Sequence, residues 1–218
     1  MHLVIFGASG RTGNHLVRQA IGMGHDVTAF VRRPNKLPLA HERLRVVVGD
    51  ARDRFNVDRA LHHADAVITT IGPVLTEPED TLATIGQTII QSMHRQHITR
   101  FVTLSDSYAV MHPHFKVPIS QRLSQVFATP TSARLLRIAQ QYAIAITSNS
   151  AINWSIVRTH QLVDGDFTGQ YTVDTQNRRL NVSISRANVA DFMLRIAING
   201  NHIKEMPIVS ENEPAKAL

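Results

Sequence analysis

The sequence predicts an α/β fold built on a doubly wound parallel sheet in three layers. Short apolar runs, beginning with residues 3–6, alternate with segments whose apolar residues recur at helical spacing, beginning with residues 16–21. Parallel strands need crossover helices, and right-handed crossovers cover both faces of the sheet. The chain has 218 residues, of which 43% are hydrophobic, and this suffices for one such domain with a sizeable core.

The expected elements follow one another in regular order through most of the chain. Strands are expected at residues 3–6, 27–31, 44–48, 66–70, 100–104, 154–157 and 206–209. The first helix ends at Gly22 and Gly24, and later helices are expected at residues 57–61, 81–94, 132–148 and 189–198. Residues 106–128 are expected to form a loop with one short helix, and residues 211–218 a frayed tail.

A small hairpin is expected to be added to this sheet near the C-terminus. Residues 169–183 alternate weakly between apolar and polar, with Tyr171 and Val173 followed by Leu180 and Val182. Ser185 then precedes the last helix and is expected to cap it, because serine accepts hydrogen bonds from the first free amides of a helix.

Composition and charge narrow the classes of function. Without cysteine, the chain forms neither disulfides nor thiolate metal sites. His94 and His97 could reach one metal from a helix, but no acidic residue lies in the same stretch to complete the site, so the histidines are interpreted as surface residues and no metal is expected. The net charge of +6 comes from scattered basic residues, which fits a small anionic cofactor better than nucleic acid. No apolar run approaches about 20 residues, and the opening MHLVIFG resembles a strand rather than a signal peptide. We therefore expect no membrane partner and a cytoplasmic protein.

A glycine-rich turn follows the first strand and is the strongest motif in the chain. Gly7, Gly10 and Gly13 form the spacing G-x-x-G-x-x-G between a strand and a helix. The first glycine permits a tight turn, the second lets backbone approach a pyrophosphate, and the third lets helix and strand pack closely. The amides at the helix start then face the phosphates. A purely structural turn is the alternative, but the context favours a dinucleotide site. The candidate binding residues here are Gly7, Ser9, Gly10, Arg11, Thr12 and Gly13.

The end of the second strand indicates which dinucleotide is bound. NAD sites carry an acidic residue there to hold the ribose 2′-hydroxyl, whereas this chain has Arg32 and Arg33. Guanidinium groups match phosphate geometry, and Arg11 could add to the same patch. Solvated loop arginines are the alternative interpretation. The sequence predicts a preference for NADP(H), with NAD(H) as the second option.

Later strand ends supply further candidates, because ligands bind at the carboxyl ends of parallel strands. Asp50 and Ala51 follow the third strand and could contact adenine, and Ile71 and Gly72 follow the fourth and would pass near the ribose. The catalytic candidates are Ser105, His160 and Tyr108, where Ser105 ends the fifth strand, His160 follows the sixth and Tyr108 lies three residues past Ser105.

The ordered motifs of the chain resemble the atypical short-chain dehydrogenase/reductases, in particular the NmrA-like and biliverdin reductase B (flavin reductase)-like NAD(P)-binding branch. These motifs are GASGRTG, RRPNK, GDARD, TTIG, FVTLSDS, INWSIVR and ISRANVADFML. The resemblance implies one Rossmann-like domain over residues 1–218, with substrate-side elements mainly in residues 106–130 and 160–185. It also implies NADPH-dependent reduction of a flavin, quinone or similar flat acceptor, or, as the alternative, an NADP(H)-sensing regulator without catalysis.

The chain departs from the usual catalytic pair of short-chain dehydrogenases, a tyrosine and a lysine four residues apart. The matching positions fall at about Leu136 and Gln140, and Tyr142 on the same helix is followed four residues later by Ile146. Hydride transfer to a flavin or quinone does not require a positioned acid, because water can supply the proton. We therefore expect a small-molecule acceptor, with Ser105 hydrogen-bonding its carbonyl or simply satisfying the strand end. The expected assembly is a monomer or homodimer.

Overall fold

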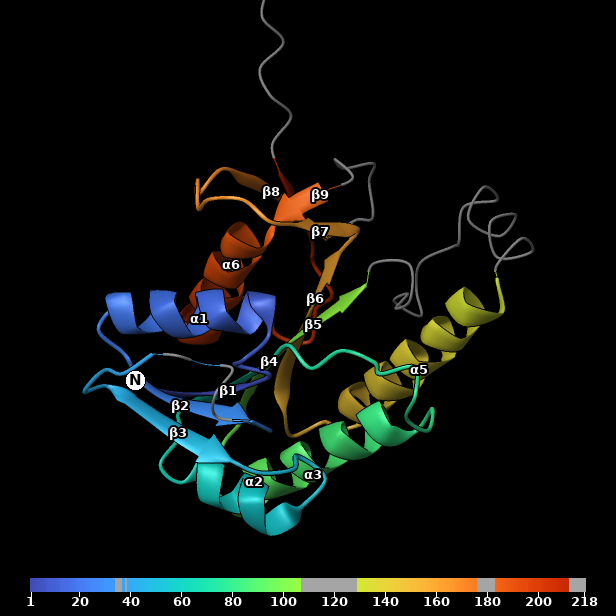
Figure 1. The fold of residues 1–218 in the computed structure, drawn as a ribbon. Coiled ribbons are helices and arrows are strands. Elements are labelled where there is room, and N and C mark those ends of the chain that lie inside the picture. Colours follow the sequence, from blue (N-terminus) through green and yellow to red (C-terminus); the bar gives the residue numbers. More distant parts are fainter. Residues whose placement is uncertain (34–36, 38, 107–128, 176–182, 212–218) are drawn as a thin grey trace, which may run out of the picture.

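The computed structural model describes residues 1–33, 37, 39–106, 129–175 and 183–211. Within these residues, eight strands form one sheet in the order β3-β2-β1-β4-β5-β6-β10-β8 (Figure 1). All neighbours in this sheet are parallel except β8, which runs antiparallel to β10. The strands are β1 (His2–Phe6), β2 (Asp26–Val31), β3 (Leu44–Val48), β4 (Ala66–Thr69), β5 (Arg100–Asp106), β6 (Asn153–Thr159), β8 (Tyr171–Asp174) and β10 (Ile208–Glu211).

Helices cover both faces of the sheet, which confirms the predicted three-layer, doubly wound fold. Helices α1 (Arg11–Gly22) and α6 (Arg186–Asn199) lie on one face, and α2 (Arg54–Leu61), α3 (Thr81–Arg95) and α5 (Pro130–Thr147) on the other (Figure 1). Strand β1 is buried on both sides and alternates between the two cores. Val4 and Phe6 pack toward α2, α3 and α5, while Leu3 and Ile5 pack toward α1 and α6. Strand order reverses beside β1, which creates the crevice where such sheets bind ligands.

Three of the later helices, α2, α5 and α6, begin with a side-chain cap. The Ser185 hydroxyl accepts a hydrogen bond from the Asn188 amide at 3.1 Å, so Ser185 caps α6 as predicted. Asp53 caps α2 by accepting from the Phe55 amide at 2.9 Å. Helix α1 begins without a side-chain cap, because its cap residue is Gly10; α3 likewise has no side-chain cap. The amides that begin α1 are therefore left available to another partner.

Both ends of the expected hairpin are strands, and each pairs with another strand of the fold. Strand β8 pairs with the C-terminal strand β10, with Val173 opposite Val209. A separate two-stranded sheet joins β7 (Gln161–Val163) to β9 (Ser183–Ser185) in parallel. Leu180 and Val182 of the expected hairpin lie outside the described residues. Alternation predicts a strand but does not select its partner, and β10 offers β8 an edge that is already fixed by its pairing with β6.

The expected tail also begins later than predicted, because Glu211 belongs to β10. Its carboxylate accepts hydrogen bonds from the Ser185 amide at 2.8 Å and from the Asn188 side chain at 2.9 Å, which tie it to the start of α6. In the part of the chain that the structure describes, no helix is long and apolar enough to cross a membrane.

Candidate functional site

A cavity of about 310 Å³ lies at the carboxyl ends of β1, β2, β3 and β4. Its position beside the reversal of strand order is where doubly wound sheets bind ligands. Eight of the predicted cofactor residues are among those that line it: Gly7, Ser9, Gly10, Arg32, Asp50, Ala51, Ile71 and Gly72. Residues 73–80, which connect β4 to α3 and which we call the strap, form the opposite wall together with the start of α3.

The glycine turn forms the floor of this site and cannot hold side chains at its key positions. Gly7 adopts a φ of +75°, and a Cβ there would come within 2.9 Å of the Thr70 hydroxyl. The Gly10 amide donates to the Gly7 carbonyl at 2.9 Å, and a Cβ on Gly13 would lie only 2.1 Å from that carbonyl oxygen. Turn, strand and helix are thus in direct backbone contact, and the uncapped start of α1 faces the space above them. This arrangement fits a dinucleotide pyrophosphate.

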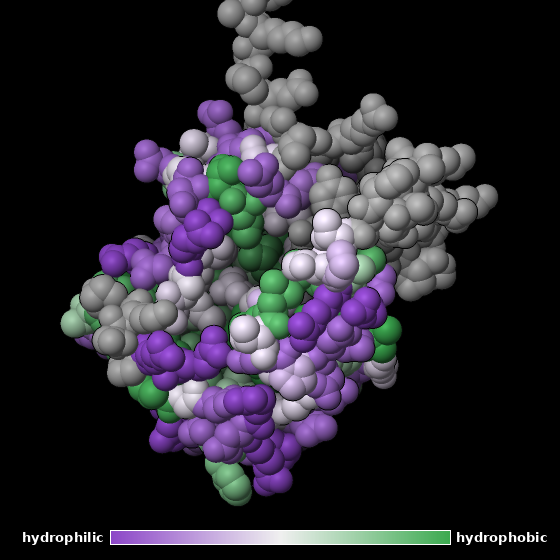
Figure 2. Space-filling view, turned by 45° about the vertical axis from the view of Figure 1, so that its right-hand side comes forward, coloured by the Kyte–Doolittle hydropathy of each residue, from purple (hydrophilic) through white to green (hydrophobic). Residues whose placement is uncertain are grey.

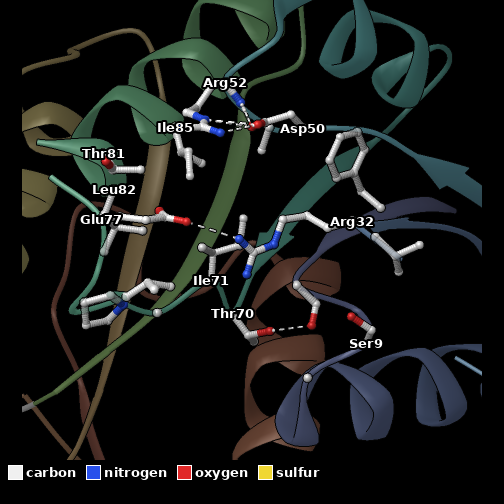
Figure 3. Close-up of a pocket in the computed structure, with 18 of the residues that line it drawn as sticks. Ser9, Arg32, Asp50, Arg52, Thr70, Ile71, Glu77, Thr81, Leu82 and Ile85 are labelled. Atoms are coloured by element: carbon white, nitrogen blue, oxygen red, sulfur yellow. Dashed lines mark hydrogen bonds and ion pairs between the residues drawn. The ribbon is translucent and has the colours of Figure 1, made fainter. Parts of the chain in front are cut away.

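Two arginine–carboxylate pairs occupy the polar part of the cavity (Figure 3). Arg32 donates to the Glu77 carboxylate of the strap at 3.3 Å. Arg52 contacts the Asp50 carboxylate through both its Nε, at 3.0 Å, and its terminal nitrogen, at 2.5 Å. These hydrogen bonds from Arg52 hold the pKa of Asp50 below its usual range. The site therefore presents two guanidinium groups, each already neutralised by an internal carboxylate.

The strap is clamped onto α5 by two arginines that are not among the residues lining the cavity. Arg137 donates to both oxygens of Glu79 at 3.0 and 2.8 Å, and Arg134 donates to the Glu77 carbonyl at 2.9 Å. Arg134 also lies 3.5 Å from the Glu79 carboxylate. The clamp fixes the backbone of the strap, and with it the point from which the Glu77 side chain reaches toward Arg32.

The other walls of the cavity are apolar and suit a flat ring. They come from the ends of β2 and β4, from the segment after β3, from α3 and from α5, and consist of Phe30, Ala51, Ile71, Leu82, Ile85 and Ile138. Figure 2 shows apolar side chains bordering a hollow near the centre of that view, surrounded by hydrophilic residues. A polar end and an apolar end in one cavity match the phosphate and base of a nucleotide.

Four predicted cofactor residues are not among the residues that line the cavity. Thr12 is buried in the first turn of α1, and Gly13 acts through the packing described above. Arg11 points to Asp164, 3.4 Å away, and both of these side chains are largely exposed. Arg33 is exposed beside Arg32 but does not face the cavity. Their assignment as ligands stays a prediction.

Sequence reasoning missed two charged residues of the site, Arg52 and Glu77. Arg52 follows Asp50 within the quoted motif GDARD, so the strand-end rule could have found it. Glu77 lies on a connecting segment with no motif of its own, and only the folded strap brings it to Arg32. No signal in the sequence identifies it.

Two of the three catalytic candidates, Ser105 and His160, lie at the same edge of the sheet but are not among the residues that line the cavity. Strands β5 and β6 pair Ser105 with Arg158 and end at the following pair, so His160 comes directly after that edge. Ser105 and His160 are half-buried, and neither is among the described residues that line the cavity. Tyr108 lies outside the described residues. The arrangement brings Ser105 and His160 to neighbouring strand ends and leaves their roles as predictions.

Tyr142 of α5 is not placed as a proton donor. Its hydroxyl lies 3.1 Å from the Thr103 hydroxyl in the core, and burial raises the pKa of Tyr142 to about 12. A catalytic tyrosine needs access to substrate and a lowered pKa. Within the described ranges, no group of three or more His, Cys, Asp or Glu side chains is arranged to hold a metal ion.

Comparison with known proteins agrees with this geometry. A family model described as NAD(P)H-binding matches residues 7–199. Similar solved structures include the oxidoreductase ylbE from Lactococcus lactis, at 17% identity and a TM-score of 0.77, covering 99% of this chain and 93% of that chain. A Rossmann-fold NAD(P)-binding family protein from Shigella flexneri has 19% identity and a TM-score of 0.74, with 100% and 98% covered. A short-chain dehydrogenase/reductase from Veillonella parvula in complex with NADP has 17% identity and a TM-score of 0.73, with 97% and 95% covered. At these identities, the likeness establishes the fold.

Proposed function

The chain belongs to the NAD(P)H-binding family, and from this premise we propose that it is an NADPH-dependent oxidoreductase that reduces a flavin, quinone or similar flat acceptor. The observation that carries the proposal is the cavity itself. A glycine turn with an uncapped helix start lies at one side of it, and a guanidinium takes the place at the end of β2 where an NAD site carries an acid.

Each part of the cofactor has candidate residues of this chain to hold it. The amides at the start of α1 bind the pyrophosphate, which can approach them closely because Gly7 and Gly10 carry no side chains. Arg32 binds the 2′-phosphate, which favours NADP(H) over NAD(H). The apolar walls around Ala51 and Ile71 enclose the adenine. The Veillonella parvula protein of the same fold, which was solved with NADP, supports this preference.

The chemistry relies on orientation rather than on an acid–base pair of the protein. When bound, NADPH supplies a hydride, and the acceptor takes it together with a proton from water. Ser105 at the end of β5 and His160 after β6 bind and orient the acceptor carbonyl. Residues 106–130 and 160–185 are the proposed substrate side. The burial of Tyr142 supports this choice of acceptor, because an electrophilic flavin or quinone needs no positioned proton donor.

Steady-state oxidation of NADPH with a panel of flavins and quinones tests the proposal. We expect turnover with at least one flat acceptor. The absence of turnover with every acceptor, despite cofactor binding, contradicts the enzymatic function. For the cofactor preference, we expect the double variant R32A/R33A to weaken NADPH binding much more than NADH binding. Single variants divide the effect, and Arg32→Ala should account for most of it because only Arg32 lines the cavity. Equal losses for both cofactors would refute the assignment of the 2′-phosphate site.

A second candidate function is a sensor of NADP(H) without catalysis. Two observations favour it: helix α5 contains no lysine, and its one tyrosine is buried in the core. A sensor binds NADPH and NADP⁺ but does not oxidise NADPH, whichever acceptor is supplied. The acceptor panel therefore distinguishes the two candidates in a single set of measurements.

A further inference from the structure

The pair formed by Arg32 and Glu77 places an internal acid where a ligand phosphate is expected. Arg32 reaches Glu77 through one contact of 3.3 Å, and its side chain is 70% exposed. Glu77 is only 29% exposed, lines the cavity and points toward Arg32 from the opposite wall (Figure 3). A carboxylate and a phosphate oxygen compete for the same guanidinium donors.

We propose that Glu77 is a specificity-determining residue that competes with the 2′-phosphate of NADP(H) for Arg32 and thereby limits the discrimination between NADPH and NADH. This inference rests on the proposed function, because it assumes that the cavity binds the adenosine part of the cofactor. It assigns the choice of cofactor to the strap as well as to the end of β2.

Of the two charged pairs in the cavity, the one with Glu77 is the pair that a ligand opens. Arg52 and Asp50 are two residues apart, and Asp50 accepts from the backbone amide as well as from the guanidinium of Arg52. The ion pair between Arg52 and Asp50 forms within one short segment, so we expect it to remain intact when a ligand binds. Arg32 and Glu77 come from separate segments and share a single longer contact, so a bidentate phosphate displaces the carboxylate more easily.

The displaced carboxylate cannot move far away, because α5 holds the strap. Arg134 binds the carbonyl of Glu77 itself, and Arg137 binds Glu79 through both oxygens. Glu77 can rotate its side chain, but its backbone stays at the wall of the cavity. A bound 2′-phosphate, with about −1.5 to −2 charges, therefore remains near a fixed negative charge.

The 2′-hydroxyl of NADH meets a different situation. It is neutral and can donate a hydrogen bond to Glu77 while leaving the pair with Arg32 intact. Glu77 thus weakens binding of the phosphorylated cofactor and leaves the unphosphorylated one unaffected or slightly favoured. Removing its charge should raise the preference for NADP(H).

The test uses two nucleotides that differ only in the 2′-phosphate, adenosine 2′,5′-bisphosphate and adenosine 5′-monophosphate, with binding to the full chain measured by calorimetry. Glu77→Gln should strengthen binding of the bisphosphate on the order of tenfold at low salt. This is the effect expected for removing one negative charge in contact with the phosphate, with water as the surrounding medium. Binding of the monophosphate should change less than about twofold, and the gain should shrink as salt is raised. If Glu77→Gln does not fold, Glu77→Asp, which withdraws the carboxylate by one methylene, should change binding in the same direction.

Asp80→Asn is the matched control, because it removes one negative charge from the same strap at a side chain that neither lines the cavity nor makes a capping hydrogen bond. We expect it to alter the ratio of the two affinities less than about twofold. In a double-mutant cycle, Glu77→Gln should have no effect on the ratio once Arg32 is Gln. An unchanged ratio in Glu77→Gln, an equal change in Asp80→Asn, or a full effect without Arg32 would overturn the inference. If the wild type binds neither nucleotide, the proposed function fails as well. If it binds both and only the ratio fails to respond, the inference alone is wrong.

Discussion

The substitution Gly13→Ala tests the backbone contact on which the glycine turn depends. The added methyl would lie 2.1 Å from the Gly7 carbonyl oxygen and 2.8 Å from Ala8 Cα, whereas ordinary contacts of a Cβ begin at 3.4 Å. Both neighbours are backbone atoms and cannot rotate away. Helix α1 and the turn must therefore separate by about 1 Å, which breaks the packing of the helix against β1.

Forced expansion of a packed contact costs about 1–3 kcal/mol. For a chain of this length, each kcal/mol lowers Tm by about 2–4 °C, so Tm should fall by roughly 2–12 °C. Thermal and denaturant unfolding of the protein without nucleotide measure this change. Gly22→Ala, at the last residue of the same helix, is the control, since a Cβ there meets nothing within 4 Å.

The control substitution should leave stability unchanged or raise it by about 0.4–1 kcal/mol, because alanine reduces the freedom of the unfolded chain. Binding of NADPH should also weaken in Gly13→Ala and not in Gly22→Ala, because only the former displaces the amides at the helix start. A Gly13→Ala protein as stable as the wild type would refute the close approach of helix and turn.

Three further substitutions test other parts of the structure. Tyr142→Phe removes the buried hydrogen bond to Thr103 and should cost about 1–2 kcal/mol in denaturant unfolding; because the pKa of Tyr142 is raised, the pH profile of NADPH oxidation should stay the same between pH 6 and 9. Ser185→Ala removes the cap of α6 and should cost about 1 kcal/mol, while Ser185→Thr should retain most of the stability. The hydrogen bonds from α5 lower the pKa of Glu79, so its contribution to stability is present above its ordinary pKa of 4.5 and is lost as the pH falls through the lowered value; Glu79→Gln should therefore lower Tm at pH 7 and match the wild type at pH values below that point.

The sequence predicted the sheet and the glycine turn because both depend on local patterns. Apolar runs and helical stripes identify the alternating elements, and the three glycines act within seven residues of one another. The resemblance to NAD(P)-binding proteins is confirmed by the family match over residues 7–199. What was missed depends on distant parts of the chain. The clamp joins Glu79 to Arg137, 58 residues away, and a residue type alone does not indicate such a partner.

Neighbouring side chains in a connection are equally hard to distinguish. Arg32 and Arg33 follow the same strand and carry the same charge, yet only Arg32 faces the cavity. Arg32 is joined to Glu77 on the strap, 45 residues away, and such a contact is not visible in a local pattern. The sequence does not predict the pairing of β8 with β10 for a related reason: alternation of apolar and polar residues indicates which face of a strand is buried, but not which strand lies beside it.

The position of β10 in the sheet has a consequence for biosynthesis. This strand is the last described element of the chain, yet it lies between β6 and β8, both of which are made earlier. While the ribosome is still translating α6, β6 is an open edge and β8 has no partner in the large sheet. That edge closes only when residues 208–211 emerge, so the nascent chain exposes unpaired backbone to chaperones and proteases until β10 has been made.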